Sequence, residues 1–227
     1  MREGPDPFAI RRYEGTANDR AVIDLTHSFG SEMPVYPGDP APRLEKTASI
    51  EQCGFNLYCL CSGLHVGTHL DAPLHMIEHG ARVSDITLRR FFGRGRLVDA
   101  RGRTTVRADL LDDLSLEQGD IVVVLTGWYK RFRERQYYTS FPDIAPDFAT
   151  RIADTGVSIL TLDTPSPDRD PFPVHKILLS REILIVENLD NVESLLECAS
   201  FEVIALPAKL ECEAAPARVI AVSLFPV

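Results

Sequence analysis

The amino-acid sequence predicts an α/β fold built on a mixed β-sheet. Short apolar runs, such as residues 121–125 and 183–186, alternate with segments that carry helix-starting and helix-ending signals. Several of the expected strands are separated by loops alone, so a strictly doubly wound order is not expected. No glycine-rich phosphate-binding motif follows the first strand, and a nucleotide cofactor therefore has no signature in this chain.

Length and composition indicate an ordinary globular protein. A chain of 227 residues supports one substantial core, so we expect residues 21–227 to form a single domain and residues 1–20 to be a polar N-terminal arm. The net charge of −9 argues against binding to nucleic acid or to an anionic membrane. No apolar run is long enough to span a membrane, and the N-terminus lacks the apolar stretch of a secretory signal. A cytoplasmic location is expected.

The expected elements at the start of the chain are a strand, a loop and a strand pair. Residues 21–25 form a short strand, and residues 44–62 form one or two more. Three prolines and a glycine in residues 33–40 exclude helix or central strand between them. That loop is either part of a pocket wall or a surface loop anchored by Tyr36.

The cysteines favour structural roles. Their number is five and they are widely scattered, which does not suggest a disulfide framework. Cys59 and Cys61 lie close to a histidine-rich segment and are conceivable metal ligands. They also belong to the alternating segment 55–61, and we expect them to be inward-facing strand residues.

Residues 64–79 predict a metal site. Four of the six histidines of the chain fall in this window with an aspartate between them: His65, His69, Asp71, His75 and His79. Neutral imidazole and carboxylate are common ligands of zinc and related divalent ions. A fully extended chain would hold His65 and His69 about 13 Å apart. We therefore expect a bend near Gly67, where glycine permits unusual backbone dihedrals.

The side chains after the bend are expected to converge. Asp71 lies two residues beyond His69, so an extended backbone aims both side chains the same way. Pro73 stiffens the following stretch and holds His75 beside the site. His79 is expected at the surface or behind the ligands.

The middle of the chain predicts alternating helices and strands. Ser84 begins a helix that continues to Gly93, and a second helix covers residues 107–114 with Thr105 as its cap. Strands are expected at residues 96–100 and 119–127. Residues 128–138 interleave basic and aromatic side chains, which we interpret as an amphipathic surface segment because the chain is acidic.

The C-terminal part follows the same pattern. Helices are expected at residues 146–155, with Gly156 past the end, and at residues 190–198. Strands are expected at 157–163, 183–186 and 202–206, and the chain finishes on the apolar segment 218–225. A turn-rich loop carries Asp163 and Asp168 at a strand end, and His175 is expected in the connection that follows. Glu187 directly follows an apolar strand, where a charge is costly unless it is paired or exposed. Both readings of Glu187 remain open at this point.

The pattern His65-x-Gly67-Thr68-His69-x-Asp71-x-Pro73-x-His75 resembles the signature of the cyclase family of metal-dependent hydrolases, which includes bacterial kynurenine formamidases and isatin hydrolases. The opening segment, residues 24–40, is also similar to that family. The resemblance implies a compact α/β domain around a curved, barrel-like β core. It also implies that His175 and Glu187 complete the metal site, with Asp71 between two ions.

The resemblance implies a chemistry as well. We expect two divalent ions, zinc first and manganese as the alternative, to activate water for attack on the carbonyl of a small aryl amide such as N-formylkynurenine. His75 is expected to act as general base and then general acid, with a third metal ligand or an outer hydrogen bonder as alternatives. Tyr36, Phe29 and Trp128 are expected to contact the substrate, although Trp128 suits a core position equally.

Three other functions stay open. The first is hydrolytic ring opening of isatin, a lactam, an imide or a lactone, and the second is a non-catalytic metal-binding member of the family. Polyketide cyclisation, which the family name implies, has no supporting feature in this sequence. Family members commonly form dimers or larger assemblies, so a homodimer or a higher homo-oligomer is expected.

Overall fold

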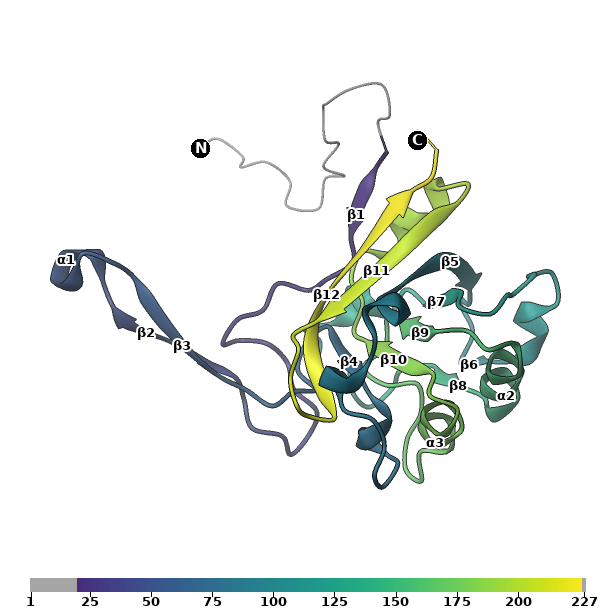
Figure 1. Ribbon diagram of the computed structural model, residues 1–227, viewed down its shortest axis with the longest axis horizontal. Helices are drawn as coiled ribbons and strands as arrows, with labels where there is room; N and C mark the ends of the chain where they lie inside the picture. Colours follow the sequence, from purple (N-terminus) through teal and green to yellow (C-terminus); the bar gives the residue numbers. More distant parts are fainter. Residues whose placement is uncertain (1–19, 226–227) are drawn as a thin grey trace.

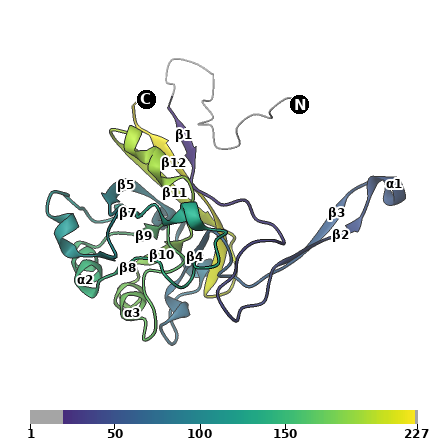
Figure 2. The same ribbon diagram turned by 180° about the vertical axis from the view of Figure 1, so that it is seen from behind.

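Seven strands close into a mixed barrel in the computed structural model, which describes residues 20–225 (Figures 1 and 2). The order around the barrel is β12-β11-β5-β7-β9-β10-β4, and β4 pairs with β12 to close it. The strand bounds are β4 His69–Asp71, β5 Phe92–Asp99, β7 Ile121–Leu125, β9 Ile159–Leu162, β10 Leu184–Glu187, β11 Phe201–Pro207 and β12 Ala214–Ser223. The barrel-like β core that the resemblance implied is confirmed. The predicted arm, residues 1–20, lies outside the described residues except for Arg20.

Pairing around the barrel divides it into a parallel and an antiparallel part. Strands β5, β7, β9 and β10 run parallel to one another, whereas β11, β12 and β4 pair antiparallel with their neighbours. Outside the ring, β1 (Val22–Asp24) pairs antiparallel with β12. A separate small parallel pair joins β6 (Thr105–Val106) to β8 (Asp143–Ile144).

The parallel strands are buried on both faces. Along β7, Ile121 and Val123 point into the barrel core, and Val122 and Val124 belong to a second core. That second core lies under helices α2 (Pro146–Thr155) and α3 (Pro173–Ser180). This explains why residues 121–125 are continuously apolar, since a strand covered on both sides has no solvent face.

Helix α2 confirms a sequence prediction, and α3 corrects one. Pro146 stands in the first turn of α2, and Gly156 ends the helix in the left-handed region with φ of 72°. The connection predicted to carry His175 is a helix instead, and His175 lies in the first turn of α3. Pro173 suits that turn, and the Asp168 carboxylate accepts the N–H of Val174 at 2.5 Å.

Three other predicted helices are single turns or short 3-10 segments. Residues 84–93 form two 3-10 turns, and β5 already begins at Phe92, which leaves no room for a longer helix. Thr105 pairs in β6 instead of capping a helix, and a 3-10 turn follows at Ala108–Leu111. The segment predicted at 190–198 is a 3-10 helix, Val192–Glu197.

A hairpin arm extends away from the barrel (Figure 1). It consists of β2 (Arg43–Ala48), the short helix α1 (Ile50–Cys53) at its tip, and β3 (Leu57–Cys61). Cys59 and Cys61 are exposed on it, so our prediction of inward-facing cysteines is wrong. Alternation along a strand predicts two faces, but here neither face of β3 is covered by the described part of the chain.

The segment from Trp128 to Tyr138 is amphipathic, as predicted. Its basic side chains are exposed, whereas Phe132 and Tyr137 are buried in a third apolar cluster. No helix within residues 20–225 is both long and apolar enough to cross a membrane.

Candidate metal centre

A bend at Gly67 and the short strand β4 bring the first three predicted ligands together. Gly67 has φ of +65°, so the chain turns where the sequence predicted. His65 Nδ1 then lies 3.0 Å from Asp71 Oδ1 and 3.2 Å from His69 Nε2. His69 and Asp71 share one face of β4, and His69 Nε2 is 3.5 Å from Asp71 Oδ1.

Strand β10 adds Glu187 to the same face. β10 pairs antiparallel with β4 so that Glu187 stands directly opposite His69. Glu187 Oε2 lies 3.4 Å from His69 Nε2, and the residue is 5% exposed. The reading of Glu187 as an exposed strand end is therefore wrong, because the strand end is covered.

Helix α3 supplies His175 from the other side. His175 Nε2 lies 3.3 Å from Glu187 Oε1 and 3.9 Å from Asp71 Oδ2. Its other ring nitrogen, Nδ1, is 2.5 Å from Asp168 Oδ1. His69, Asp71 and Glu187 face outward from the barrel, because Leu70 and Val186 between them belong to the barrel core. The cluster thus lies between the barrel wall and α3.

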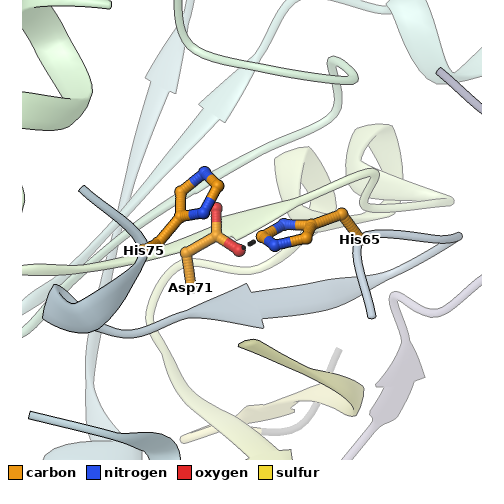
Figure 3. Close-up of side chains that lie close together, drawn as sticks. All are labelled: His65, Asp71 and His75. Atoms are coloured by element: carbon orange, nitrogen blue, oxygen red, sulfur yellow. Dashed lines mark ion pairs between the residues drawn. The ribbon is translucent and has the colours of Figure 1, made fainter. Parts of the chain in front are cut away.

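His75 follows β4 in a 3-10 turn, Pro73–His75, and its ring lies beside the cluster (Figure 3). The centroid of the His75 ring is 4.3 Å from that of His65 and 5.6 Å from that of His175. His65, Asp71 and His75 can offer three donor atoms within 4.8 Å of one another. A metal ligand and a proton carrier both fit this position. His79 projects into solvent with its side chain 92% exposed.

Carboxylates control the protonation of the buried histidines. Burial opposes the charged form of His69, but Asp71 and Glu187 outweigh it and raise its pKa to about 9. Burial likewise opposes charge on His175, and the hydrogen bonds to Asp168 and Glu187 raise its pKa to about 10. Burial dominates at His75 and lowers its pKa. The His75 ring is therefore unprotonated at neutral pH, as a proton acceptor must be.

The residues fit a divalent cation. Both oxygens of Asp71 are fully buried, and neither accepts a well-aligned hydrogen bond from any described residue, although His65 Nδ1 is close. A buried carboxylate is costly unless positive charge lies beside it: the protonated rings of His69 and His175 supply that charge in ion-free protein, and a bound cation would supply it in their place. The surrounding donors are imidazole and carboxylate, which zinc and its neighbours prefer. Two overlapping groups, His65-Asp71-His75 and His69-Asp71-Glu187, have donor atoms close enough for an ion, and Asp71 is common to both.

The expected substrate residues lie around a separate apolar cluster, which includes Val66 from the histidine-rich segment 64–79 (the metal window). This cluster contains Met33, Val66, Phe132 and Tyr137, with Phe29 and Trp128 packed against it. Tyr36 is 40% exposed, and the centroid of its ring lies 5.8 Å from that of Tyr138 in a T-shaped contact. The indole N–H of Trp128 donates to the Tyr137 carbonyl at 2.9 Å, which is an anchoring contact.

Sequence reasoning assigned no role to three residues at this site. Asp168 bonds His175, Glu213 Oε1 lies 3.6 Å from His65 Nε2, and Tyr138 donates to the Pro34 carbonyl at 2.9 Å. Glu213 immediately precedes β12 and reaches His65 because β12 pairs with β4. The position of Asp168 at a predicted strand end could have indicated its role at the site. No feature of the neighbouring sequence indicates a role for Glu213.

Comparison with known proteins shows the family of this chain. The Cyclase family model matches residues 23–169. The chain is 32% identical over 211 residues to the kynurenine formamidase of Paracidovorax citrulli, a match that covers 88% of this chain and 96% of that relative. The chain belongs to the cyclase family.

Two solved structures have the same fold. A protein described as a potential metal-dependent hydrolase with cyclase activity is 29% identical, with a TM-score of 0.76, covering 91% of this chain and 100% of that one. Isatin hydrolase A from Labrenzia aggregata is 21% identical, with a TM-score of 0.80, covering 90% and 94%. At that identity the second likeness concerns the fold alone.

Proposed function

We propose that this cyclase-family protein is a metal-dependent hydrolase that cleaves the carbon–nitrogen bond of a small aryl amide. The substrate that we propose is of the N-formylkynurenine type. The observation that carries the proposal is the convergence of histidines and carboxylates from β4, β10 and α3 on the fully buried carboxylate of Asp71. Similarity to kynurenine formamidase over most of the chain supports the substrate class.

His65, His69, Asp71, His175 and Glu187 would hold two divalent ions, zinc first and manganese as the alternative. The mixed imidazole and carboxylate donors favour zinc, and carboxylate alone would favour a harder ion. When bound, such ions acidify water and polarise a carbonyl oxygen. The chain itself would supply the metal ligands and transfer the proton of the attacking water. Burial of His69, Asp71 and Glu187 excludes bulk water from them.

His75 is the proton carrier in this proposal. Histidines that bind a metal ion present one nitrogen to it and hold the other with an acceptor. His69 Nδ1 lies 2.8 Å from the Gly67 carbonyl, His175 Nδ1 2.5 Å from Asp168, and His65 Nε2 3.6 Å from Glu213. Among the hydrogen bonds of the described residues, none holds the His75 ring. A free ring with a lowered pKa accepts the proton of the attacking water and returns it to the leaving nitrogen.

The aromatic side chains beside the metal window would form the wall for an aryl ring. Val66 is next to His65 in sequence and packs in the cluster with Phe29 and Trp128. Tyr36 stands at the exposed margin of that group against Tyr138. Flat apolar rings of this kind bind aryl substrates by stacked or edge contacts.

An activity panel tests the proposal. Zinc- and manganese-loaded protein is assayed with N-formylkynurenine, other N-formyl arylamines, isatin and simple lactones, after elemental analysis of the purified protein. Hydrolysis of N-formyl arylamines that a chelator abolishes is the expected result. Opening of isatin alone would favour the ring-opening alternative. Metal content without hydrolysis of any substrate would favour a binding protein.

We also propose a homodimer formed through the hairpin arm. Between residues 43 and 61, all of which the structure describes, six large apolar side chains are 39–65% exposed: Leu44, Ile50, Phe55, Leu57, Tyr58 and Leu60. Side chains alternate along β3, so Tyr58 and Leu60 lie on one face of the hairpin with Leu44, which pairs with Leu60, and Leu57 lies on the other face. A partner arm therefore has apolar side chains to cover on both faces, and a stable interface of this kind buries at least about 1,200 Å² in total.

The arm proposal is tested by oligomeric state. Light scattering after size exclusion should show a dimer for the wild type and a monomer for a Leu57→Asp, Leu60→Asp double variant. Leu88→Asp is the matched control, since Leu88 is 71% exposed on the body of the protein. A wild-type monomer would contradict the proposal.

A cytoplasmic location stays a prediction, which cell fractionation tests.

A further inference from the structure

The hydrogen bond between Asp168 and His175 has a consequence for the proposed metal site, on which this inference rests. Asp168 is 5% exposed and lies seven residues before His175, in the loop that leads to α3. Its two oxygens are used separately. Oδ1 lies 2.5 Å from His175 Nδ1, and Oδ2 accepts the backbone N–H of Val174 at 2.5 Å and lies 3.4 Å from the N–H of His175.

This arrangement fixes the tautomer of His175. A carboxylate oxygen can accept but not donate, so the proton of a neutral His175 ring must sit on Nδ1. Nε2 then presents its lone pair toward Glu187 and Asp71, which lie 3.3 Å and 3.9 Å away. An imidazole binds a metal ion through the unprotonated nitrogen.

We propose that Asp168 is a positioning residue that selects the metal-binding tautomer of His175, separately from its role at the start of α3. The same carboxylate accepts the N–H of Val174 and holds Nδ1 of His175, and an asparagine can replace it in the first contact but not in the second. The backbone N–H of Val174 needs an acceptor, which an amide oxygen also provides. The Nδ1 proton of His175 needs an acceptor too, but an amide that uses its oxygen on Val174 turns its NH₂ group toward Nδ1.

Asp168→Asn and Asp168→Ala therefore differ in a diagnostic way. The asparagine retains the contact to Val174 and presents a donor to Nδ1, which moves the ring proton to Nε2 and blocks the ligand nitrogen. Alanine removes both contacts but leaves the tautomer free. We expect Asp168→Asn to keep the higher stability of the two in metal-free form, and yet to bind Zn²⁺ no better than Asp168→Ala.

The experiment measures two quantities without substrate. Zn²⁺ affinity is determined by competition with a chelator, and the Tm of each metal-free protein by thermal unfolding. Both variants should bind Zn²⁺ about 10–100-fold more weakly than the wild type, the usual effect of losing a hydrogen-bond partner behind a metal ligand. Asp190→Asn is the control, since Asp190 Oδ2 faces His27 Nδ1 at 3.4 Å, a histidine outside the metal cluster. It should bind Zn²⁺ like the wild type.

The tautomer itself is read from ¹⁵N-histidine NMR of the zinc-loaded proteins. The His175 signal of the wild type should show a protonated Nδ1 and an Nε2 without hydrogen, and that of Asp168→Asn should not. If Asp168 acted through helix capping alone, Asp168→Asn would bind Zn²⁺ like the wild type, which would overturn the inference. Wild-type protein that bound no Zn²⁺ would overturn the metal site as well, so the two failures are distinguishable.

Discussion

His69 and Glu187 stand directly opposite each other on the antiparallel strands β4 and β10, with Nε2 and Oε2 3.4 Å apart. The two residues are 118 positions apart in sequence, and strand register alone sets their distance. A shift of one residue would turn Glu187 into the barrel core. The candidate metal site therefore depends on the pairing of β4 with β10.

The first prediction concerns Glu187. Glu187→Gln retains the shape of the side chain and removes its charge, so we expect zinc affinity to fall at least about tenfold, because the site loses an anionic donor. Metal content after dialysis and chelator competition measure the effect. Glu202→Gln, an exposed glutamate on β11, is the control and should load metal normally. Unchanged zinc affinity in Glu187→Gln would remove Glu187 from the ligand set.

The second prediction separates the roles of His75. If the ring carries protons, His75→Ala should lower kcat by about 10²–10⁴-fold at unchanged metal content. His79→Ala is a matched histidine control, because its side chain is exposed. Loss of one metal equivalent in His75→Ala would make His75 a ligand, and unchanged turnover would exclude it from the chemistry.

The third prediction concerns the bend at Gly67. An alanine there would adopt φ of +65°, and its Cβ would lie 2.2 Å from Met33 Cε. The backbone strain alone costs about 1–2 kcal/mol. We expect Gly67→Ala to lower both the free energy of unfolding and the metal content, since His65 and His69 lie on either side of the bend. Gly30→Ala is the control, because no atom lies within 4 Å of its added Cβ. Equal behaviour of the two variants would contradict the role of the bend.

The fourth prediction is a pH dependence. In ion-free protein the pKa of His69 is about 9 and that of His175 about 10, so both rings are protonated at neutral pH. Zinc must displace these protons, and its affinity should therefore rise with pH up to about 9. Calorimetry in buffers of different ionisation enthalpy counts the protons released. Zinc binding without proton release would contradict the assignment.

The same pKa shifts determine whether the stability of ion-free protein rises or falls with pH. The folded-state pKa of His69 lies above the ordinary value of 6.5, so its contribution is complete below that pH and is lost as pH rises toward 9. We expect the Tm of ion-free protein to fall over this range, whereas zinc-loaded protein gains stability from tighter binding. Thermal scans with and without a chelator measure both trends.

Local sequence determined the features that depend on neighbouring residues. The apolar run of β7, helix α2 between Pro146 and Gly156, and the bend at Gly67 follow from burial pattern, capping and backbone freedom. The pattern from His65 to His75 also sufficed to indicate a metal site and the family.

Tertiary structure decided what depends on distant pairing. Whether Glu187 is exposed or buried was open in the sequence, because the answer lies in β4 and α3, which cover it. The helix that carries His175 begins where the Asp168 carboxylate accepts the N–H of Val174, and Cys59 is exposed because its strand lies in an arm that leaves the barrel. Spacing along the chain sets which side chains share a face, but strand register and packing set which faces meet.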